Sequence, residues 1–238
     1  MRVLALFVLF MVGTTLFAHD APYRVAKFQD VLSHSKLQAP LSSYDPLWSR
    51  GYGDFAFYQN RYFYLQDESY MTFEMCQKKH RSELREQHDW KVETKEPKTM
   101  EATLLLFPLS SKREFTFLQI HADSNRMTAA KTILNKPLLR VVWKKNYHHL
   151  KDHIWAVVRV SADPKEQKYM KIDLGKRPRD FFRVKVVVAQ SKMKIYVADK
   201  LCFNFDVSYW NGVWNYFKAG VYLQDEGCAK VLFKELKF

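Results

Sequence analysis

The sequence predicts an all-β protein built as an antiparallel β-sandwich or jelly roll. Many short runs rich in aromatic and β-branched residues follow one another, and turn residues separate them. Aromatic side chains, which favour strands over helices, make up 16% of the chain, with 18 Phe and 13 Tyr. No long segment shows the 3.6-residue period of an amphipathic helix. Short connections between the runs indicate antiparallel pairing, and 238 residues fit one domain of this class.

The first element is a predicted signal peptide over residues 1–18. Arg2 precedes an apolar run at 3–12, and small and polar residues then lead to Ala18. The run is short for a membrane span, and an uncleaved anchor helix is the alternative. No later stretch is apolar enough to cross a bilayer. We therefore expect a secreted, extracellular protein with a single domain over residues 19–238 and no stable membrane association.

The remaining elements are a short helical or irregular arm and a series of strands. The arm is expected at 23–35. The predicted strands are 62–65, 70–75, 99–107, 114–121, 138–143, 154–160, 182–189, 192–197, 216–224 and 229–238. Gln190 and Ser191 separate two of these strands and predict a hairpin turn.

The three cysteines do not form a zinc-binding pattern. Cys76, Cys202 and Cys228 lack the paired spacing of such sites. An oxidising compartment would allow one disulfide and leave one thiol. The sequence leaves the pairing open, with Cys202 and Cys228 the nearest pair along the chain and three free thiols as the alternative.

The formal net charge of +13 favours polyanionic partners. Nucleic acid, an anionic membrane and an acidic polysaccharide all satisfy it, as does a basic surface with no specific ligand. Nucleic acid is disfavoured by the predicted signal peptide and by the lack of a known binding motif.

Three predicted strand segments carry apolar residues on one face and ionisable or amide residues on the other. With a two-residue period, the polar face takes Arg81, Glu83 and Arg85, then Gln119 and His121, then Tyr216, Lys218, Tyr222 and Gln224. If the strands are neighbours, these side chains form a polar groove; a solvated outer face is the alternative. Gly220 falls on the same face, where a missing side chain would let a sugar approach the backbone.

At these residues the chain resembles polysaccharide lyase family 7, the alginate lyases. The family carries R-(S/T)-E-L-R, Q-(I/V)-H and Y-F-K-A-G-x-Y-N-Q in this order, and here they stand as RSELR at 81–85, QIH at 119–121 and YFKAGVYLQ at 216–224. The resemblance runs from about residue 70 to the C-terminus, and residues 19–48 match nothing in it. Leu223 replaces the family's Asn, and strand parity points it toward the core.

The resemblance implies a concanavalin-like jelly roll with a concave substrate groove. It also implies β-elimination on alginate or a similar uronic-acid polymer, giving unsaturated oligosaccharides without a metal or organic cofactor. Arg81 and Gln119 resemble the residues that neutralise the sugar carboxylate and so stabilise an enolate-like transition state. His121 and Tyr222 resemble the catalytic base and acid. Cations such as Arg81 or Lys218 would favour the phenolate form of Tyr222.

Four further residues are expected to bind substrate. Glu83 would orient Arg81 or Arg85 through an ion pair, while Arg85, Lys218 and Gln224 would contact neighbouring sugars. Structural pairing is the alternative for these side chains. The whole protein is expected to be a monomer.

Other polar groups have simpler interpretations. His148, His149 and His153 are expected at the surface, since no further ligands complete a metal site. The basic loop 176–179 and the polar loop 91–98 could border the groove or be solvated turns. A non-catalytic, lectin-like protein on the same fold is the alternative function, although a lectin has no need of an acid and a base.

Overall fold

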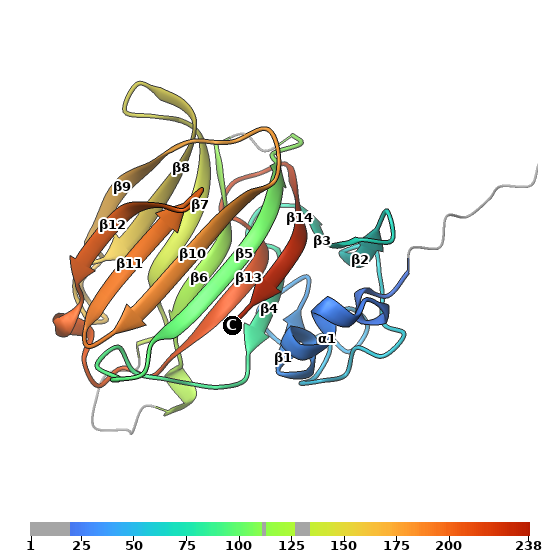
Figure 1. Ribbon diagram of the computed structural model, residues 1–238, viewed down its shortest axis with the longest axis horizontal. Helices are drawn as coiled ribbons and strands as arrows, with labels where there is room; N and C mark the ends of the chain where they lie inside the picture. The colour runs from blue at the N-terminus through green and yellow to red at the C-terminus, as the bar shows by residue number, and fades with distance from the viewer. Residues whose placement is uncertain (1–19, 111–112, 127–133) are drawn as a thin grey trace, which may run out of the picture.

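Two antiparallel sheets pack face to face in the computed structural model, which describes residues 20–110, 113–126 and 134–238 (Figure 1). We call them the groove sheet and the outer sheet. The groove sheet has the order β1-β4-β13-β6-β7-β8-β9 and the outer sheet the order β12-β11-β10-β5-β14-β3-β2. The predicted β-sandwich of jelly-roll type is thus confirmed.

The strand bounds follow the sheet order. The groove sheet comprises β1 (Ser35–Gln38), β4 (Arg81–Glu86), β13 (Asn215–Leu223), β6 (Glu114–Ala122), β7 (Pro137–Tyr147), β8 (Leu150–Arg159) and β9 (Tyr169–Lys176). The outer sheet comprises β12 (Lys200–Asp206), β11 (Lys192–Val197), β10 (Phe182–Ala189), β5 (Lys98–Phe107), β14 (Cys228–Lys237), β3 (Tyr70–Cys76) and β2 (Phe63–Gln66). The helical elements are η1 (Pro22–Arg24), α1 (Ala26–Ser33), η2 (Ser124–Arg126) and η3 (Ser208–Trp210).

The core lies between the sheets, where alternate residues of the strands meet. β10 alternates strictly between buried and half-buried residues, and β5 does so from Thr99 onward. Aromatic rings fill the space between the layers; Phe73 and Phe233, for example, pack edge to face with ring centroids 5.5 Å apart. Leu223 is fully buried, as strand parity predicts. Burial of these apolar faces supplies the main driving force for folding.

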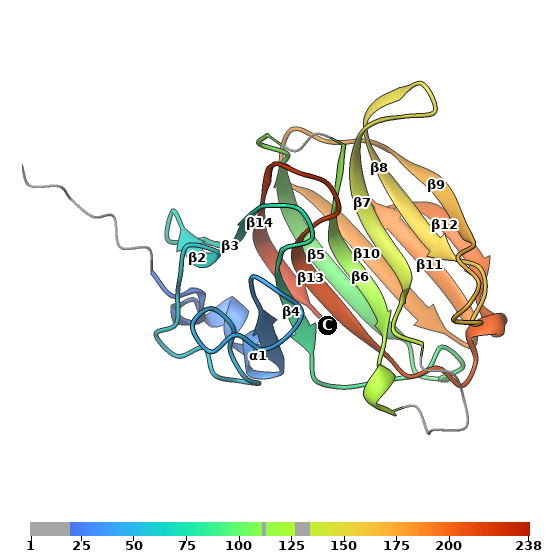
Figure 2. The same cartoon turned by 180° about the vertical axis from the view of Figure 1, so that it is seen from behind.

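The expected N-terminal arm is confirmed as a short helix followed by an edge strand. Phe28 and Leu32 of α1 are fully buried. The chain then enters β1, which pairs with β4 at the margin of the groove sheet. The arm and the loops after it form the lobe beside the sandwich in Figure 2.

The order β4-β13-β6 makes the three motif-bearing strands neighbours. β13 therefore has β4 on one side and β6 on the other, although these strands lie far apart in the sequence. Their side chains alternate between the core and one open face. This arrangement places the polar residues of the three motifs on or just beneath a single surface, except Ser82, whose hydroxyl donates to the Tyr62 carbonyl on the other side of the sheet.

Gly220 is a glycine for a different reason from the one that its position in the sequence suggested. Its φ is +143° and β13 bulges against β6 at this point. A Cβ atom here would collide with the Ser82 carbonyl and would lie 2.7 Å from the Glu83 Cα and 3.1 Å from Phe73 Cδ1. The missing side chain therefore allows close packing of β13 on β4 and the core, which corrects the expectation of a gap for sugar.

One disulfide joins Cys76 of β3 to Cys228 of β14. The two residues are direct partners in the strand register, so the bond reinforces an existing contact in the outer sheet. The pair nearest in sequence, Cys202 and Cys228, is not the one that forms. Cys202 is a free, half-buried thiol.

The predicted signal peptide, residues 1–18, lies outside the described residues. In the described part of the chain, no helix has the length and apolar character needed to cross a bilayer.

Candidate active site

Four residues singled out in the sequence meet in one open groove on the groove sheet. Arg81, Gln119, His121 and Tyr222 all line a cavity of about 350 Å³, together with Gln224. The remaining lining residues are Ser42, Asn135, Lys136, Pro137, Arg140 and Tyr169. The structure thus places the predicted base, acid and carboxylate-binding groups around one space.

The strand register explains how these side chains meet. Across β4, β13 and β6, the direct partners are Arg81 with Tyr222, Arg85 with Lys218, Lys218 with Gln119, and Tyr216 with His121. Because partners on one face have their Cβ atoms about 5 Å apart, the side chains of each pair lie side by side. The cross-strand rows therefore assemble the site from residues more than 90 positions apart, such as His121 and Tyr216.

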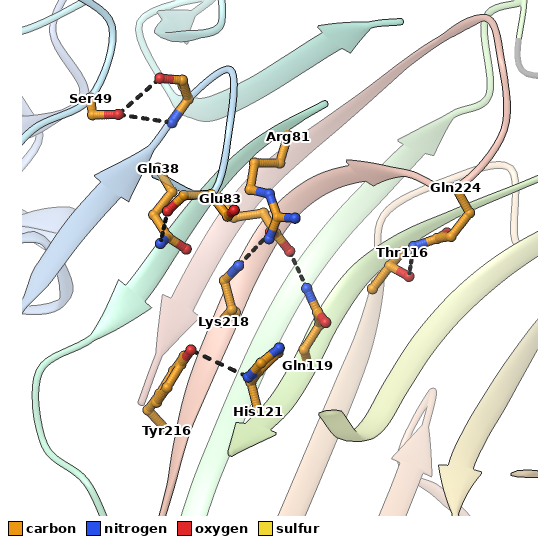
Figure 3. Close-up of polar contacts among 12 residues, drawn as sticks. Gln38, Ser49, Arg81, Glu83, Thr116, Gln119, His121, Tyr216, Lys218 and Gln224 are labelled. Carbon is orange, nitrogen blue, oxygen red and sulfur yellow. Dashed lines mark hydrogen bonds and ion pairs between the residues drawn. The ribbon is translucent and has the colours of Figure 1, made fainter. Parts of the chain in front are cut away.

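Glu83 is the centre of the polar network beneath the groove (Figure 3). Its carboxylate accepts hydrogen bonds from Lys218 Nζ at 2.6 Å and Arg81 Nη1 at 3.3 Å, and from Gln119 Nε2. Burial by itself would raise the pKa of Glu83, but Lys218, Arg81 and the hydrogen bonds together outweigh it and lower that pKa. Glu83 therefore stays ionised and holds three side chains in place.

Glu83 and Lys218 lie under the groove and not in it. Each is only 1% exposed, and neither lines the cavity. Burial lowers the pKa of Lys218 to about 8, although Glu83 opposes this, so the lysine remains charged at neutral pH. Lys218 therefore has a supporting position in place of the expected sugar contact, while the expected ion pair of Glu83 with Arg81 is present.

His121 is held as a neutral ring with one nitrogen free. Its Nδ1 lies 2.9 Å from the Ala122 carbonyl oxygen. A carbonyl only accepts, so Nδ1 carries the hydrogen and Nε2 keeps its lone pair. Burial and the nearby Lys218 lower the pKa of His121 to about 4. At neutral pH the ring can therefore accept a proton at Nε2.

Tyr222 lies against a guanidinium. The Arg81 Cζ is 4.3 Å from the centre of the Tyr222 ring. A cation over a ring face in this way is attracted to it. The contact therefore holds the Tyr222 ring at the groove, beside the predicted carboxylate-binding Arg81.

Arg85 also acts from beneath the groove. It is 8% exposed, pairs with Asp123 at 3.1 Å and places its Cζ 3.9 Å from the centre of the Tyr216 ring. Tyr216 in turn stacks on His121, and its hydroxyl lies 3.3 Å from His121 Nδ1. Arg85 thus supports the histidine through Tyr216, and the expected sugar contact is replaced by this structural pairing.

Gln224 is the expected binding residue that does face the groove. Its Nε2 donates to Thr116 Oγ1 at 2.6 Å. Its Oε1 is buried and has no hydrogen-bond partner among the described residues. A buried amide oxygen without a partner is costly, so a hydroxyl of a bound ligand would satisfy it.

One wall of the groove comes from the loop after β1, which sequence reasoning did not assign. Ser42 lines the cavity, and its loop is held by Gln38 Nε2, which donates to the Ser42 carbonyl at 2.7 Å. The Arg81 amide donates to the Pro40 carbonyl at 2.7 Å, and Ser49 bridges the Ala39 backbone (Figure 3). No sequence pattern marks such a loop as part of a site.

The opposite wall includes Arg140 of β7 and Tyr169 of β9. Both were missed in the sequence. The one available signal was Arg140, a charged residue inside the otherwise apolar run 138–143.

Two other sets of residues were noted in the sequence: the basic loop 176–179, and His148, His149 and His153. Neither set lines the groove. Arg177 of the basic loop 176–179 is buried, pairs with Asp152 at 2.8 Å and donates to the Leu106 carbonyl. Among the residues that the structure describes, no three His, Cys, Asp or Glu side chains gather as metal ligands.

The loop 91–98 packs against the turn between β10 and β11 of the outer sheet. The Gln190 amide donates to the Thr94 carbonyl and the Ser191 amide to the Val92 carbonyl. The loop therefore packs on the β10–β11 turn and does not line the groove.

Comparisons with known proteins show the family to which the chain is related. A family model described as alginate lyase matches residues 30–238. An alginate lyase of Photobacterium sp. (strain ATCC 43367) is 30% identical over 252 residues, covering 91% of this chain and 87% of that protein.

Solved structures show the same fold. The alginate lyase AlyC3 in complex with dimannuronate has a TM-score of 0.81 and 28% identity, over 92% of this chain and 94% of that one. Alginate lyase A1-II', a member of polysaccharide lyase family 7, has a TM-score of 0.70 and 21% identity, over 87% of this chain and 94% of its own.

Proposed function

The chain belongs to the alginate lyase family, and from this we propose that it cleaves alginate or a similar uronic-acid polymer by β-elimination. One observation carries the proposal: Arg81, Gln119, His121 and Tyr222 line a single open groove. The similar lyase AlyC3 was solved with dimannuronate, which supports a uronate as the sugar. Among the residues that the structure describes, those lining the groove include no Asp or Glu, as suits a polyanionic ligand.

The first task of the groove is to make the C5 proton of a uronate more acidic. Neutralising the neighbouring carboxylate stabilises the charge that develops as this proton leaves. We assign this role to Arg81 and Gln119. The Glu83 network fixes both side chains before substrate arrives, so little reorganisation accompanies the reaction.

The second task is the transfer of two protons. A base takes the C5 proton, the C–H electrons form the C4–C5 double bond, and the C4–O4 bond breaks as an acid protonates O4. Tyr222 serves as both base and acid when the proton and the leaving group lie on one side of the ring. His121, neutral and with Nε2 free, serves as the base when they lie on opposite sides, and Tyr222 is then the acid that protonates O4. The products are shorter chains with an unsaturated uronate at the new non-reducing end.

The direct test is an assay of the purified protein on alginate, polymannuronate, polyguluronate and glucuronan. We expect ultraviolet absorbance to rise as the unsaturated product forms and the chains to shorten. Tyr222→Phe removes the proton-transfer group and should lower kcat by about 10²–10⁴-fold. Tyr196→Phe, on β11 of the outer sheet, is the matched control and should keep full activity. Binding of the polymers without shortening would contradict the proposal and favour a lectin-like protein.

We further propose that the protein is secreted as a monomer. The signal-like pattern at residues 1–18 and the Cys76–Cys228 disulfide both support an oxidising, extracellular destination. Mass spectrometry of the protein from its culture medium should find an N-terminus near His19, and size-exclusion chromatography should give the mass of one chain. Retention of the full-length chain in the cell would contradict secretion.

A further inference from the structure

We propose that Arg140 binds the carboxylate of a uronate next to the one that reacts, and so helps to select a polyanionic chain. This inference rests on the proposed function. Arg140 lines the groove, but none of the three motifs contains it.

The strand register places Arg140 in the same row as the catalytic network. Arg85, Lys218, Gln119 and Arg140 are successive direct partners across β4, β13, β6 and β7. Neighbouring strands lie about 4.8 Å apart, close to the repeat of one sugar unit in an extended polymer. Arg140 is therefore one strand away from Gln119, where the carboxylate of an adjacent sugar would lie.

Arg140 differs from the other cations of this row in lacking an anionic partner. Lys218 pairs with Glu83 and Arg85 with Asp123. Arg140 has no ion pair or hydrogen bond from its side chain to any residue that the structure describes. A half-buried guanidinium without an anionic partner is unfavourable, and burial accordingly lowers the pKa of Arg140, although the neighbouring Tyr169 and Tyr222 oppose this. A carboxylate from the ligand would relieve this cost, and the planar guanidinium fork matches its geometry.

The surroundings of Arg140 leave it free to meet a ligand. Tyr169, which also lines the groove, is held from behind by the fully buried Arg159, whose Nη1 donates to the tyrosine hydroxyl at 3.2 Å. Arg159 also donates to the backbone carbonyls of Ser161 and Asp163. The wall beside Arg140 is therefore held in place by hydrogen bonds, so a ligand that binds there need not rearrange Tyr169.

The test compares Arg140→Ala and Arg140→Lys with wild type on alginate, over a series of salt concentrations. Loss of a hydrogen-bonded charge pair should raise KM for Arg140→Ala by about 10-fold, with kcat close to that of wild type. The dependence of KM on salt should weaken, because one ion pair with the polymer is lost. Arg140→Lys should recover part of the affinity.

Arg183→Ala is the matched control, since it removes the same charge from β10 of the outer sheet. It should leave KM and its salt dependence unchanged. An unchanged KM for Arg140→Ala, or a fall in kcat alone, would overturn the inference. Inactivity of the wild type on every uronan would instead overturn the proposed function, so the two failures are distinguishable.

Discussion

At the scale of single residues, the environment of His121 predicts how activity depends on pH. Its pKa of about 4 arises from burial and Lys218, so the ring is neutral and able to accept a proton down to about that pH. If His121 is the base, the acidic limb of kcat/KM should lie near pH 4 and not near 6.5, the usual value for histidine. A limb between pH 6 and 7 that disappears in His121→Ala would contradict this.

The measurement needs a control for folding. The unfolded chain protonates His121 near pH 6.5, whereas the folded protein does so only near pH 4. Below pH 6.5 the unfolded state therefore binds more protons, and stability falls as the pH is lowered toward 4. Circular dichroism at each pH separates loss of the base from loss of the fold.

The buried network around Glu83 leads to a second prediction, about stability and activity. Glu83→Gln removes the buried negative charge and leaves Lys218 and Arg81 without their anion. Breaking one side of a buried pair should cost about 3–5 kcal/mol of unfolding free energy, and kcat should fall because Arg81 and Gln119 lose their anchor. Urea unfolding and the lyase assay measure the two effects.

Glu101→Gln provides the comparison for Glu83. Glu101 pairs with Arg183 at 2.7 Å and with Lys185 at 3.6 Å on the outer sheet, where solvent reaches all three. Its loss should cost no more than about 1 kcal/mol. Equal losses for the two variants would mean that the Glu83 network has no special importance.

At the scale of elements, the bulge in β13 makes a prediction about Gly220. Gly220→Ala should destabilise the fold by more than about 1–3 kcal/mol, because an unfavourable φ adds to a collision with β4. Gly175→Ala tests the φ alone, since its φ is +111° and nothing lies within 4 Å of its Cβ position. Gly51→Ala has neither problem. Melting temperatures should fall in the order Gly51→Ala, Gly175→Ala, Gly220→Ala, and a harmless Gly220→Ala would contradict this explanation.

Strands with a clear alternating pattern were predicted well from the sequence. The β10–β11 hairpin has the predicted bounds, and its turn residues Gln190 and Ser191 have φ of 50° and 58°. Three strands were missed: β1, β9 and β12. β1 is short and polar, and β12 is mostly exposed, so neither has the contrast between faces that a period-two pattern requires.

The burial of the site residues was harder to predict than the face of the sheet on which they lie. Strand parity correctly put Lys218 on the same face as Tyr222, but it does not indicate whether neighbouring side chains cover that face. Lys218 and Glu83 are nearly fully buried because β13 and β4 are flanked by other strands that carry large polar residues. Arg140 was missed because its strand, β7, carries no motif and because register across strands is not visible in the sequence.

At the scale of the whole molecule, the Cys76–Cys228 bond joins two residues that are 152 positions apart in the sequence. Such a bond restricts the unfolded chain, and its removal typically costs about 2–5 kcal/mol. Cys76→Ser should therefore lower the melting temperature, and reductant should lower that of the wild type by a similar amount. Cys202→Ser, at the free thiol, should change little. A melting temperature insensitive to reductant would show that the bond does not form.

The pairing itself could not be predicted because proximity along the chain is a poor guide to proximity in a sandwich. Cys202 lies on β12, at the edge of the outer sheet farthest from β3, whereas β14 is adjacent to β3. The net charge of +13 was equally ambiguous alone. It became informative once the structure placed Arg81, Lys136 and Arg140 in a groove whose lining includes no carboxylate.

The position of β13 has a consequence for how an active molecule comes into being. Residues 215–223 insert between two strands that the chain supplied much earlier. Until that insertion, Arg81 lies on one strand, Gln119 and His121 lie on another that is not its neighbour, and Tyr222 is absent from both. Turnover can therefore begin only after this central strand has docked, so the recovery of activity during refolding cannot precede that event.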